Sequence, residues 1–159
     1  MTRTLLPWSA LAVLVTSLAA APPPASARTD APERLRLVWP AQGTLTARFG
    51  EWRGSRRHEG IDIGMLRTLR LRAAAGGVVR EAGYTSGFDG YGKIVLLDLP
   101  GPYTALYGHL ADVRVRLGQR VRGGDRLGGA GCTGSCTGTS LHFELRRDGV
   151  AVNPLAFLR

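Results

Sequence analysis

Lysine is almost absent from this chain of 159 residues. Lys93 is the only one, and arginine supplies the rest of the 21 basic side chains, so that with 12 acidic residues the formal net charge is +9. Two interpretations stay open, a solvated arginine surface or attraction to a polyanion. The chain lacks an RNA-binding aromatic motif, zinc-finger spacing and a helix-turn-helix pattern, so we expect no nucleic-acid partner.

Long apolar runs are also scarce. The longest, LLPWSALAVLVTSLAA at residues 5–20, is interrupted early by Pro7 and falls short of the roughly 20 residues that a membrane span needs. It follows a basic MTRT and precedes Ala25-Ser26-Ala27, a small-x-small cleavage pattern. We therefore predict a signal peptide over residues 1–27, with an uncleaved anchor as the alternative. The exported protein would be extracellular, periplasmic or cell-wall associated, with no stable membrane span.

Cysteine occurs only twice, as Cys132 and Cys136 in GCTGSCTG. In an exported protein two such residues can form a disulfide, and so short a loop would mainly stiffen a Gly-rich turn. The rival interpretation is a zinc-binding pair, but one C-x-x-x-C without a second pair is a weak zinc signal. We predict the disulfide.

Helical periodicity is missing after the signal. A short polar lead-in at residues 28–36 precedes a domain at 37–159 in which short apolar segments alternate with glycine and proline: RLVW, GTLTARF, GGVVREAGY, KIVLLDL, YTALYGHL and LHFELRR. Such spacing predicts an all-β fold. In VRLGQRVRGGDRLGGAG, short strands separated by glycine turns are typical of a compact antiparallel sheet domain of the sandwich-barrel hybrid kind, the duplicated hybrid motif, with Gly-rich loops.

Histidine is limited to His58, His109 and His142. His58 and Asp62 lie in HEGIDIG, four residues apart. A regular strand would separate them by about 13 Å at 3.3 Å per residue, whereas two ligands of one zinc ion need donor atoms within about 4 Å. The chain must therefore bend between them to form a metal site, and Gly60 is a residue that permits a bulge.

The segment SLHFELR predicts a strand with two unlike faces. Ser140, His142 and Glu144 share one face, and the leucines and phenylalanine between them would pack into the core. His142 together with His58 and Asp62 would supply two imidazoles and one carboxylate, a known catalytic zinc set that leaves a fourth position for water. Glu144 either orients a ligand or is simply exposed.

Several motifs occur in a specific order: VWPAQGTLTARFG, HEGIDIG, AAAGGVVREAG, GYGKIVLL, YTALYGHL, TGTSLHFEL and NPLAFL. Over about residues 38 to 158 the chain resembles the lysostaphin-type zinc endopeptidases, the LytM-like peptidoglycan hydrolases. The resemblance implies that His58, Asp62 and His142 bind Zn²⁺ and that His109 is a catalytic histidine. The position of the family's second catalytic histidine is occupied by Ser140.

Three functions remain open. The first is a secreted zinc endopeptidase that cleaves peptide cross-links of peptidoglycan, with activity lowered by Ser140, because a serine hydroxyl is a poor base at neutral pH. The second is a zinc-binding but non-catalytic relative that binds the cell wall or activates another hydrolase. The third, a biotinyl or lipoyl carrier, needs a lysine at an exposed turn, but Lys93 opens KIVLL instead. The expected partners are peptidoglycan peptides and, through the basic surface, anionic wall polymers.

Overall fold

The structure is a computed structural model that describes residues 35–159. The signal peptide predicted for residues 1–27 and nearly all of the lead-in lie outside the described residues. Within residues 35–159, no helix has the length and apolar character that crossing a membrane requires.

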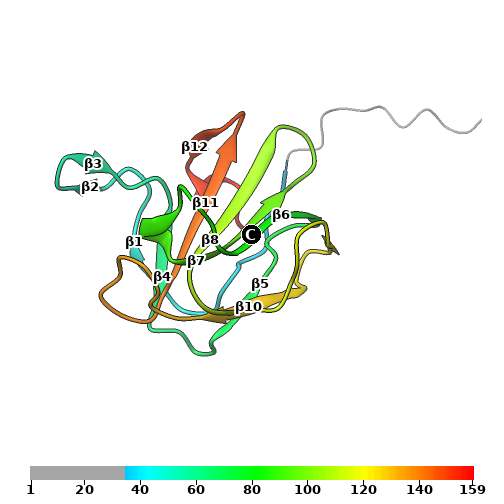
Figure 1. Cartoon of the computed structure of the whole chain (residues 1–159). Coiled ribbons are helices and arrows are strands. Elements are labelled where there is room, and N and C mark those ends of the chain that lie inside the picture. The colour runs from blue at the N-terminus through cyan, green and yellow to red at the C-terminus, as the bar shows by residue number, and fades with distance from the viewer. Residues whose placement is uncertain (1–34) are drawn as a thin grey trace, which may run out of the picture. The chain divides into compact units, whose positions relative to one another are not determined.

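Short strands and two 3-10 helices make up the described chain (Figure 1), and the prediction of an all-β, antiparallel domain is confirmed. The elements are β1 (Thr44–Ala47), β2 (Trp52–Arg53), β3 (Arg56–Arg57), β4 (Ile61–Gly64), β5 (Arg70–Arg72), β6 (Gly77–Tyr84), η1 (Asp89–Tyr91), β7 (Lys93–Asp98), β8 (Tyr103–Val113), β9 (Arg120–Val121), β10 (Arg126–Ala130), β11 (Leu141–Arg147), β12 (Val150–Val152) and η2 (Pro154–Ala156).

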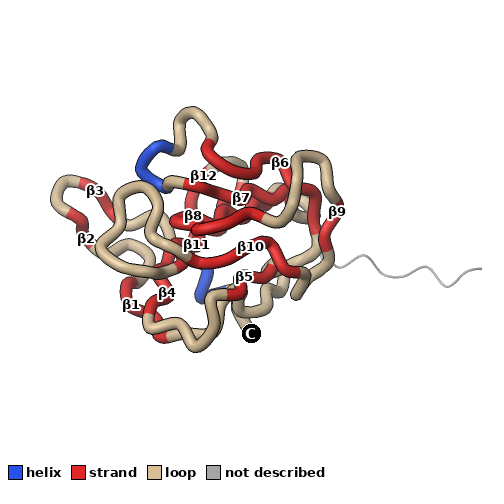
Figure 2. Tube along the Cα trace, turned by 60° about the horizontal axis from the view of Figure 1, so that its bottom comes forward, coloured by secondary structure: helices blue, strands red, loops and turns tan. Residues whose placement is uncertain are grey.

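Most strands join one sheet in the order β1-β4-β11-β8-β7-β6-β9, with neighbouring strands antiparallel. β8 bends out of this row far enough to pair also with β10, which in turn pairs with β5 (Figure 2). β2 and β3 form a separate two-stranded hairpin. The consequence that matters for function is the position of β11, which inserts between β4 and β8 although it follows β8 in the chain.

The main core lies on one face of this sheet. Leu141, Phe143 and Leu145 of β11 are fully buried in it, as the alternation in SLHFELR predicts. The segment RLVW at residues 36–39, by contrast, does not form a strand as predicted, since only Leu37 pairs, through a single parallel bridge to Leu158. Its partner Leu158 belongs to no strand, so the pairing does not extend into a ladder.

Candidate metal centre

The site is built on a row of residues that crosses three neighbouring strands. Asp62 of β4 lies directly opposite His142 of β11, and His142 lies opposite Gly108 of β8. The next residue along β8 is His109. The strand register therefore brings residues from three distant segments to one place on the sheet.

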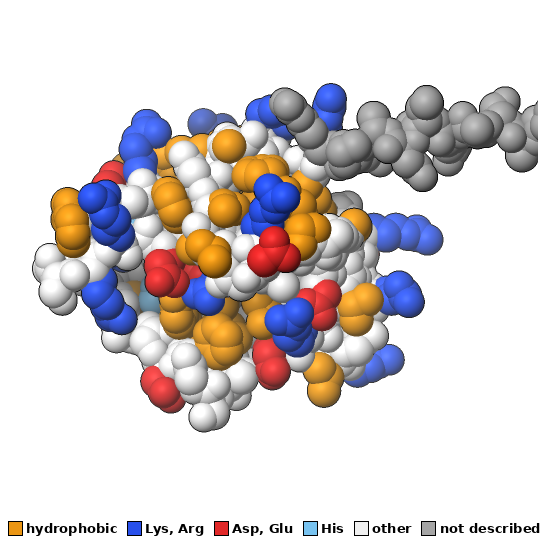
Figure 3. Space-filling model, turned by 90° about the horizontal axis from the view of Figure 1, so that it is seen from above, with side chains coloured by type: hydrophobic (Ala, Val, Ile, Leu, Met, Phe, Trp, Pro, Cys, Tyr) orange, Lys and Arg blue, Asp and Glu red, His pale blue; other side chains and the backbone are white. Residues whose placement is uncertain are grey.

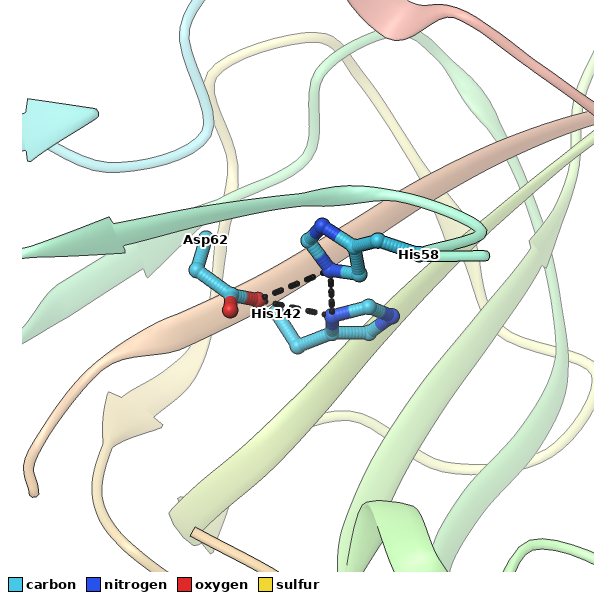
Figure 4. A group of neighbouring side chains, drawn as sticks. All are labelled: His58, Asp62 and His142. Atoms are coloured by element: carbon cyan, nitrogen blue, oxygen red, sulfur yellow. Dashed lines mark hydrogen bonds and ion pairs between the residues drawn. The ribbon is translucent and has the colours of Figure 1, made fainter. Parts of the chain in front are cut away.

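Three donor atoms converge at this point (Figure 4). Nδ1 of His142 lies 2.8 Å from Oδ1 of Asp62 and 3.1 Å from Nε2 of His58, and Nε2 of His58 lies 3.3 Å from the same carboxylate oxygen. Both imidazoles are buried. Two imidazole nitrogens and one carboxylate oxygen at this spacing fit a tetrahedral metal such as zinc with one position left open.

The far nitrogen of each imidazole is held by a second group. Nδ1 of His58 lies 2.8 Å from the carbonyl oxygen of Arg48, and Nε2 of His142 lies 2.9 Å from Oε1 of Glu144. Because a carbonyl and a carboxylate can only accept, both outer nitrogens carry the hydrogen, and both inner nitrogens present lone pairs. Lone pairs and a carboxylate this close repel one another unless a cation lies between them.

Without a metal, a proton takes the place of that cation. Burial alone would lower the pKa of His142, but Asp62 and Glu144 outweigh burial and raise it above the ordinary value. Burial would likewise raise the pKa of Asp62, but its contacts with His142, His58 and Arg53 hold it well below the usual range. The site therefore favours positive charge at its centre.

Gly60 allows His58 and Asp62 to meet, although not through a bulge within a strand. The chain bends at residues 59–60, before β4 begins, so that His58 lies outside the strand. A Cβ at Gly60 would overlap the carbonyl oxygen of Phe143 and press on the ring of His142. Glycine is needed here because β11 passes directly against the bend.

Glu144 is fully buried and lies at the centre of a polar network behind His142. Besides His142, it accepts hydrogen bonds from the hydroxyl of Tyr91 (2.7 Å) and from Nε of Arg146 (2.7 Å). Burial alone would raise the pKa of Glu144, but these three hydrogen bonds keep it lowered, so Glu144 remains ionised. Of the two alternatives left open by the sequence, the structure selects the one in which Glu144 orients His142.

His109 reaches the site through an irregularity in β8. Its φ is +65°, and the pairing of β7 with β8 shifts register between Val95 and Lys93, opposite this point. Tyr107 and Leu110, three residues apart, are both fully buried in the core, whereas a regular strand would place them on opposite faces. This β-bulge turns His109 away from the core and toward the metal-site residues, with its ring centroid 5.9 Å from that of His142.

A disulfide between Cys132 and Cys136 closes the loop that holds His109. Nδ1 of His109 donates to the carbonyl oxygen of Thr133 (2.8 Å), which leaves Nε2 as an acceptor. Burial lowers the pKa of His109, so its imidazole is neutral at neutral pH. A neutral imidazole with a free nitrogen is suited to accept a proton.

Ser140 lies two residues before His142, at a bridge with Gly131. Its hydroxyl donates to the carbonyl oxygen of Gly138 at 3.3 Å, and it makes no hydrogen bond to the three converging residues. The serine therefore supplies neither a metal ligand nor a base at this position.

His58 and His142 line a groove of about 630 Å³, in which a histidine is visible between basic and acidic side chains (Figure 3). His109, Tyr91 and Arg53 line it as well. Arg53 forms an ion pair with Oδ2 of Asp62, the oxygen that faces away from the histidines. The centre thus has an open side on which a substrate could lie.

Comparison with known proteins assigns the family. Residues 56–154 match the model described as peptidase family M23. The chain belongs to peptidase family M23. The crystal structure of the antimicrobial peptidase lysostaphin from Staphylococcus simulans superposes with a TM-score of 0.67, at 25% identity, over 78% of this chain and 53% of lysostaphin. The resemblance inferred from the motifs is confirmed.

Two relatives of this M23 chain have names that refer to NlpD. A protein of Pseudomonas aeruginosa named "Lipoprotein NlpD/LppB homolog" is 42% identical over 121 residues, which make up 76% of this chain and 39% of the relative. "Murein hydrolase activator NlpD" of Escherichia coli is 35% identical over 120 residues, 76% of this chain and 30% of the relative. The chain therefore spans well under half the length of these relatives.

Sequence reasoning placed His58, Asp62, His109 and His142 in one site, and the structure brings all four together. It missed the groups that hold them: the Arg48 carbonyl, Tyr91, Thr133, Arg146 and Arg53. Tyr91 follows a Gly-rich turn and Arg146 lies near the end of a strand, so neither position has a local pattern that distinguishes it from an exposed residue. Their roles depend on contacts between segments far apart in the chain.

Proposed function

We propose that this M23 chain is a zinc-dependent endopeptidase that is exported and cleaves peptide cross-links of bacterial peptidoglycan. The observation that carries the proposal is the convergence of Nε2 of His58, Oδ1 of Asp62 and Nδ1 of His142, with both outer nitrogens fixed by acceptors. Two lone pairs and a carboxylate at this spacing match the ligand set of a bound zinc ion, which supports a metal-dependent role.

In this proposal, three residues bind the metal and His109 transfers the proton. His58, Asp62 and His142 would hold zinc, which supplies a Lewis acid that polarises a peptide carbonyl and makes water more acidic. His109 accepts a proton from the attacking water at Nε2 and returns it to the amine that leaves when the C–N bond breaks. Thr133 fixes the ring of His109 in the tautomer that this transfer needs.

Ser140 in place of a second imidazole lowers the expected rate of peptide hydrolysis but leaves His109 and the metal-binding residues to carry out the reaction. A second imidazole there would add a base or a donor to the developing negative charge, and one such donor contributes roughly 10² to 10³ in rate. The serine hydroxyl is turned toward Gly138 instead. We infer a slow hydrolase that depends on a single imidazole.

A second candidate is a protein that binds the cell wall and activates another hydrolase. Ser140 favours it, as does the likeness to a relative named as a murein hydrolase activator. This function would use the groove for binding and would not require His109. The two candidates therefore differ in what substitution of the histidines should do.

The deciding experiment measures peptides released from purified peptidoglycan by the zinc-loaded protein, by mass spectrometry. Walls of several cross-link chemistries are tested, with His142→Ala as the metal-site control and Ser140→His as the variant that restores a second imidazole. Release by the wild type, more by Ser140→His and none by His142→Ala is the expected result.

Absence of release from every wall, with about one zinc bound per chain, would contradict the endopeptidase. The activator then predicts that the protein, inactive alone, accelerates wall digestion by a second purified hydrolase, and that His109→Ala does so equally well.

A further inference from the structure

The β2–β3 hairpin forms one wall of the groove beside the metal-site residues. It projects from the sheet as its own two-stranded unit (Figure 1), and all three of its strand arginines, Arg53, Arg56 and Arg57, line the same groove as His58 and His142. In the space-filling view, basic side chains border the hollow on the side where the hairpin lies (Figure 3). The hairpin is therefore placed to contact whatever lies across the metal site.

Positive charge in this hairpin is incompletely neutralised. The register pairs Arg53 directly with Arg56, so their side chains share one face, and like charges directly opposite each other repel. Arg53 has Asp62 as its partner. Within residues 35–159, no acidic side chain forms an ion pair with Arg56 or Arg57.

Arg57 is held in place, whereas Arg56 is not. The guanidinium of Arg57 stacks 4.5 Å from the ring centroid of Trp52 and donates to the carbonyl oxygen of Gly50 (3.2 Å). The side chain of Arg56 forms no hydrogen bond within the described part of the chain. Arg56 is thus an exposed guanidinium with all its donors free, beside a second arginine.

The acids of the groove do not neutralise this wall. Glu59 and Glu144 both pair with Arg146. Asp89, the remaining acid in the lining, belongs to η1, a segment separate from the hairpin. An anionic group between Arg53 and Arg56 would relieve their repulsion.

We propose that the β2–β3 hairpin is a carboxylate-binding subsite, and that the preferred substrates are peptides with a free carboxylate close to the bond held at the metal centre. A planar guanidinium matches a carboxylate with two parallel hydrogen bonds. This inference rests on the proposed function for the identity of the ligand as a peptide, but carboxylate preference is a property of binding alone and does not require cleavage.

The test compares two matched peptide sets on the zinc-loaded full chain. One is a series of fluorescein-labelled alanine hexapeptides in which a single glutamate occupies each position in turn, and the other has glutamine in its place. Dissociation constants are measured by fluorescence anisotropy. We expect at least one glutamate position to bind about fivefold tighter than its glutamine counterpart, the size of one partly exposed ion pair, and the preference to weaken with salt.

In Arg56→Gln, the ratio of the dissociation constants of the glutamine and glutamate peptides should fall close to one. In Arg56→Lys, part of the preference should remain. Arg116→Gln is the matched control, because Arg116 is an exposed arginine outside the groove lining. A peptide carboxylate can also bind zinc directly. The glutamate and glutamine peptides are therefore measured again on His142→Ala, in which the preference for glutamate should persist.

Equal binding of glutamate and glutamine peptides, or a preference that survives in Arg56→Gln or disappears in His142→Ala, would overturn the subsite. Binding of neither set would do so as well. Peptidoglycan cleavage is scored separately. A carboxylate preference without cleavage therefore contradicts the endopeptidase but not the subsite, and cleavage without a preference contradicts the subsite alone.

Discussion

Two parts of the site differ in how completely their side chains are held: the metal side, formed by the three converging residues, and the catalytic side, formed by His109 and Ser140. On the metal side, each imidazole has its outer nitrogen bound to a fixed acceptor, and Glu144 behind His142 has two further donors. On the catalytic side, His109 is fixed by one carbonyl, and Ser140 has turned its hydroxyl away.

The difference predicts that the proposed metal binding and the proposed catalysis can be separated by substitution. The metal side is determined by several contacts, so the loss of any outer one should weaken binding without abolishing it. The proposed catalysis depends on the single imidazole of His109, so its loss should strongly lower turnover and leave the metal in place. Each of the following changes tests one half of this contrast.

The largest effect should follow from His109→Ala. The substitution removes the proton acceptor, and the rate of peptidoglycan cleavage should fall by roughly 10² to 10⁴. Zinc content, measured by mass spectrometry of the metal, should stay near one per chain because His109 is not among the converging ligands. A loss of bound zinc together with a lower cleavage rate would show that metal binding and catalysis are not separable.

Glu144→Gln should act on metal binding. Removing the charge that orients His142 should lower zinc affinity about 10- to 100-fold, measured by competition with a chromophoric chelator. Glu59→Gln is the matched control, because Glu59 binds the same Arg146 from the exposed side and does not contact an imidazole. Equal losses in the two variants would assign the effect to Arg146 instead.

Zinc affinity should depend on pH more steeply near neutrality than for an ordinary histidine site. The pKa of His142 is raised in the metal-free protein, so a proton competes with zinc as pH falls toward and below that pKa. Affinity should decrease by about tenfold per pH unit there. Dissociation constants at pH 8, 7 and 6 test this, and a value that does not change across the range would contradict it.

The smallest effect is expected from removing the disulfide. Replacing Cys132 and Cys136 with serine should lower the free energy of unfolding by about 2 kcal/mol, from the entropy of a short closed loop. The cleavage rate should also fall because Thr133 then holds His109 less firmly. Urea unfolding measures the stability, and peptide release from peptidoglycan measures the rate. Zinc titration is the control, since a change in zinc affinity would contradict the assignment of this loop to His109.

Short-range patterns predicted the all-β fold and the faces of the segment that carries His142. The set of four site residues came from these patterns together with the resemblance to a known family, and only the resemblance implied a role for His109. Alternation along residues 140–145 gave the faces of β11, and the spacing of His58 and Asp62 required a bend. The segment RLVW was wrong as a strand because local composition does not tell whether a partner strand exists. Its only pairing is Leu37 with Leu158.

The supporting contacts could not be predicted for a related reason. The bulge that turns His109 arises where β8 leaves one neighbour for another, and Tyr91 reaches Glu144 across 53 positions of sequence. Arg53 could not be distinguished from any other arginine in a chain rich in them. Such roles depend on how distant segments pack and not on local residue pattern.

The insertion of β11 between β4 and β8 also sets when the site can exist. His58 and His142 are 84 positions apart in the chain, and the strand that carries the later one follows β1 to β10 in the sequence. A chain whose synthesis has not yet reached β11 has only part of the metal-binding set. The placement of β11 is therefore a precondition for metal binding at this centre.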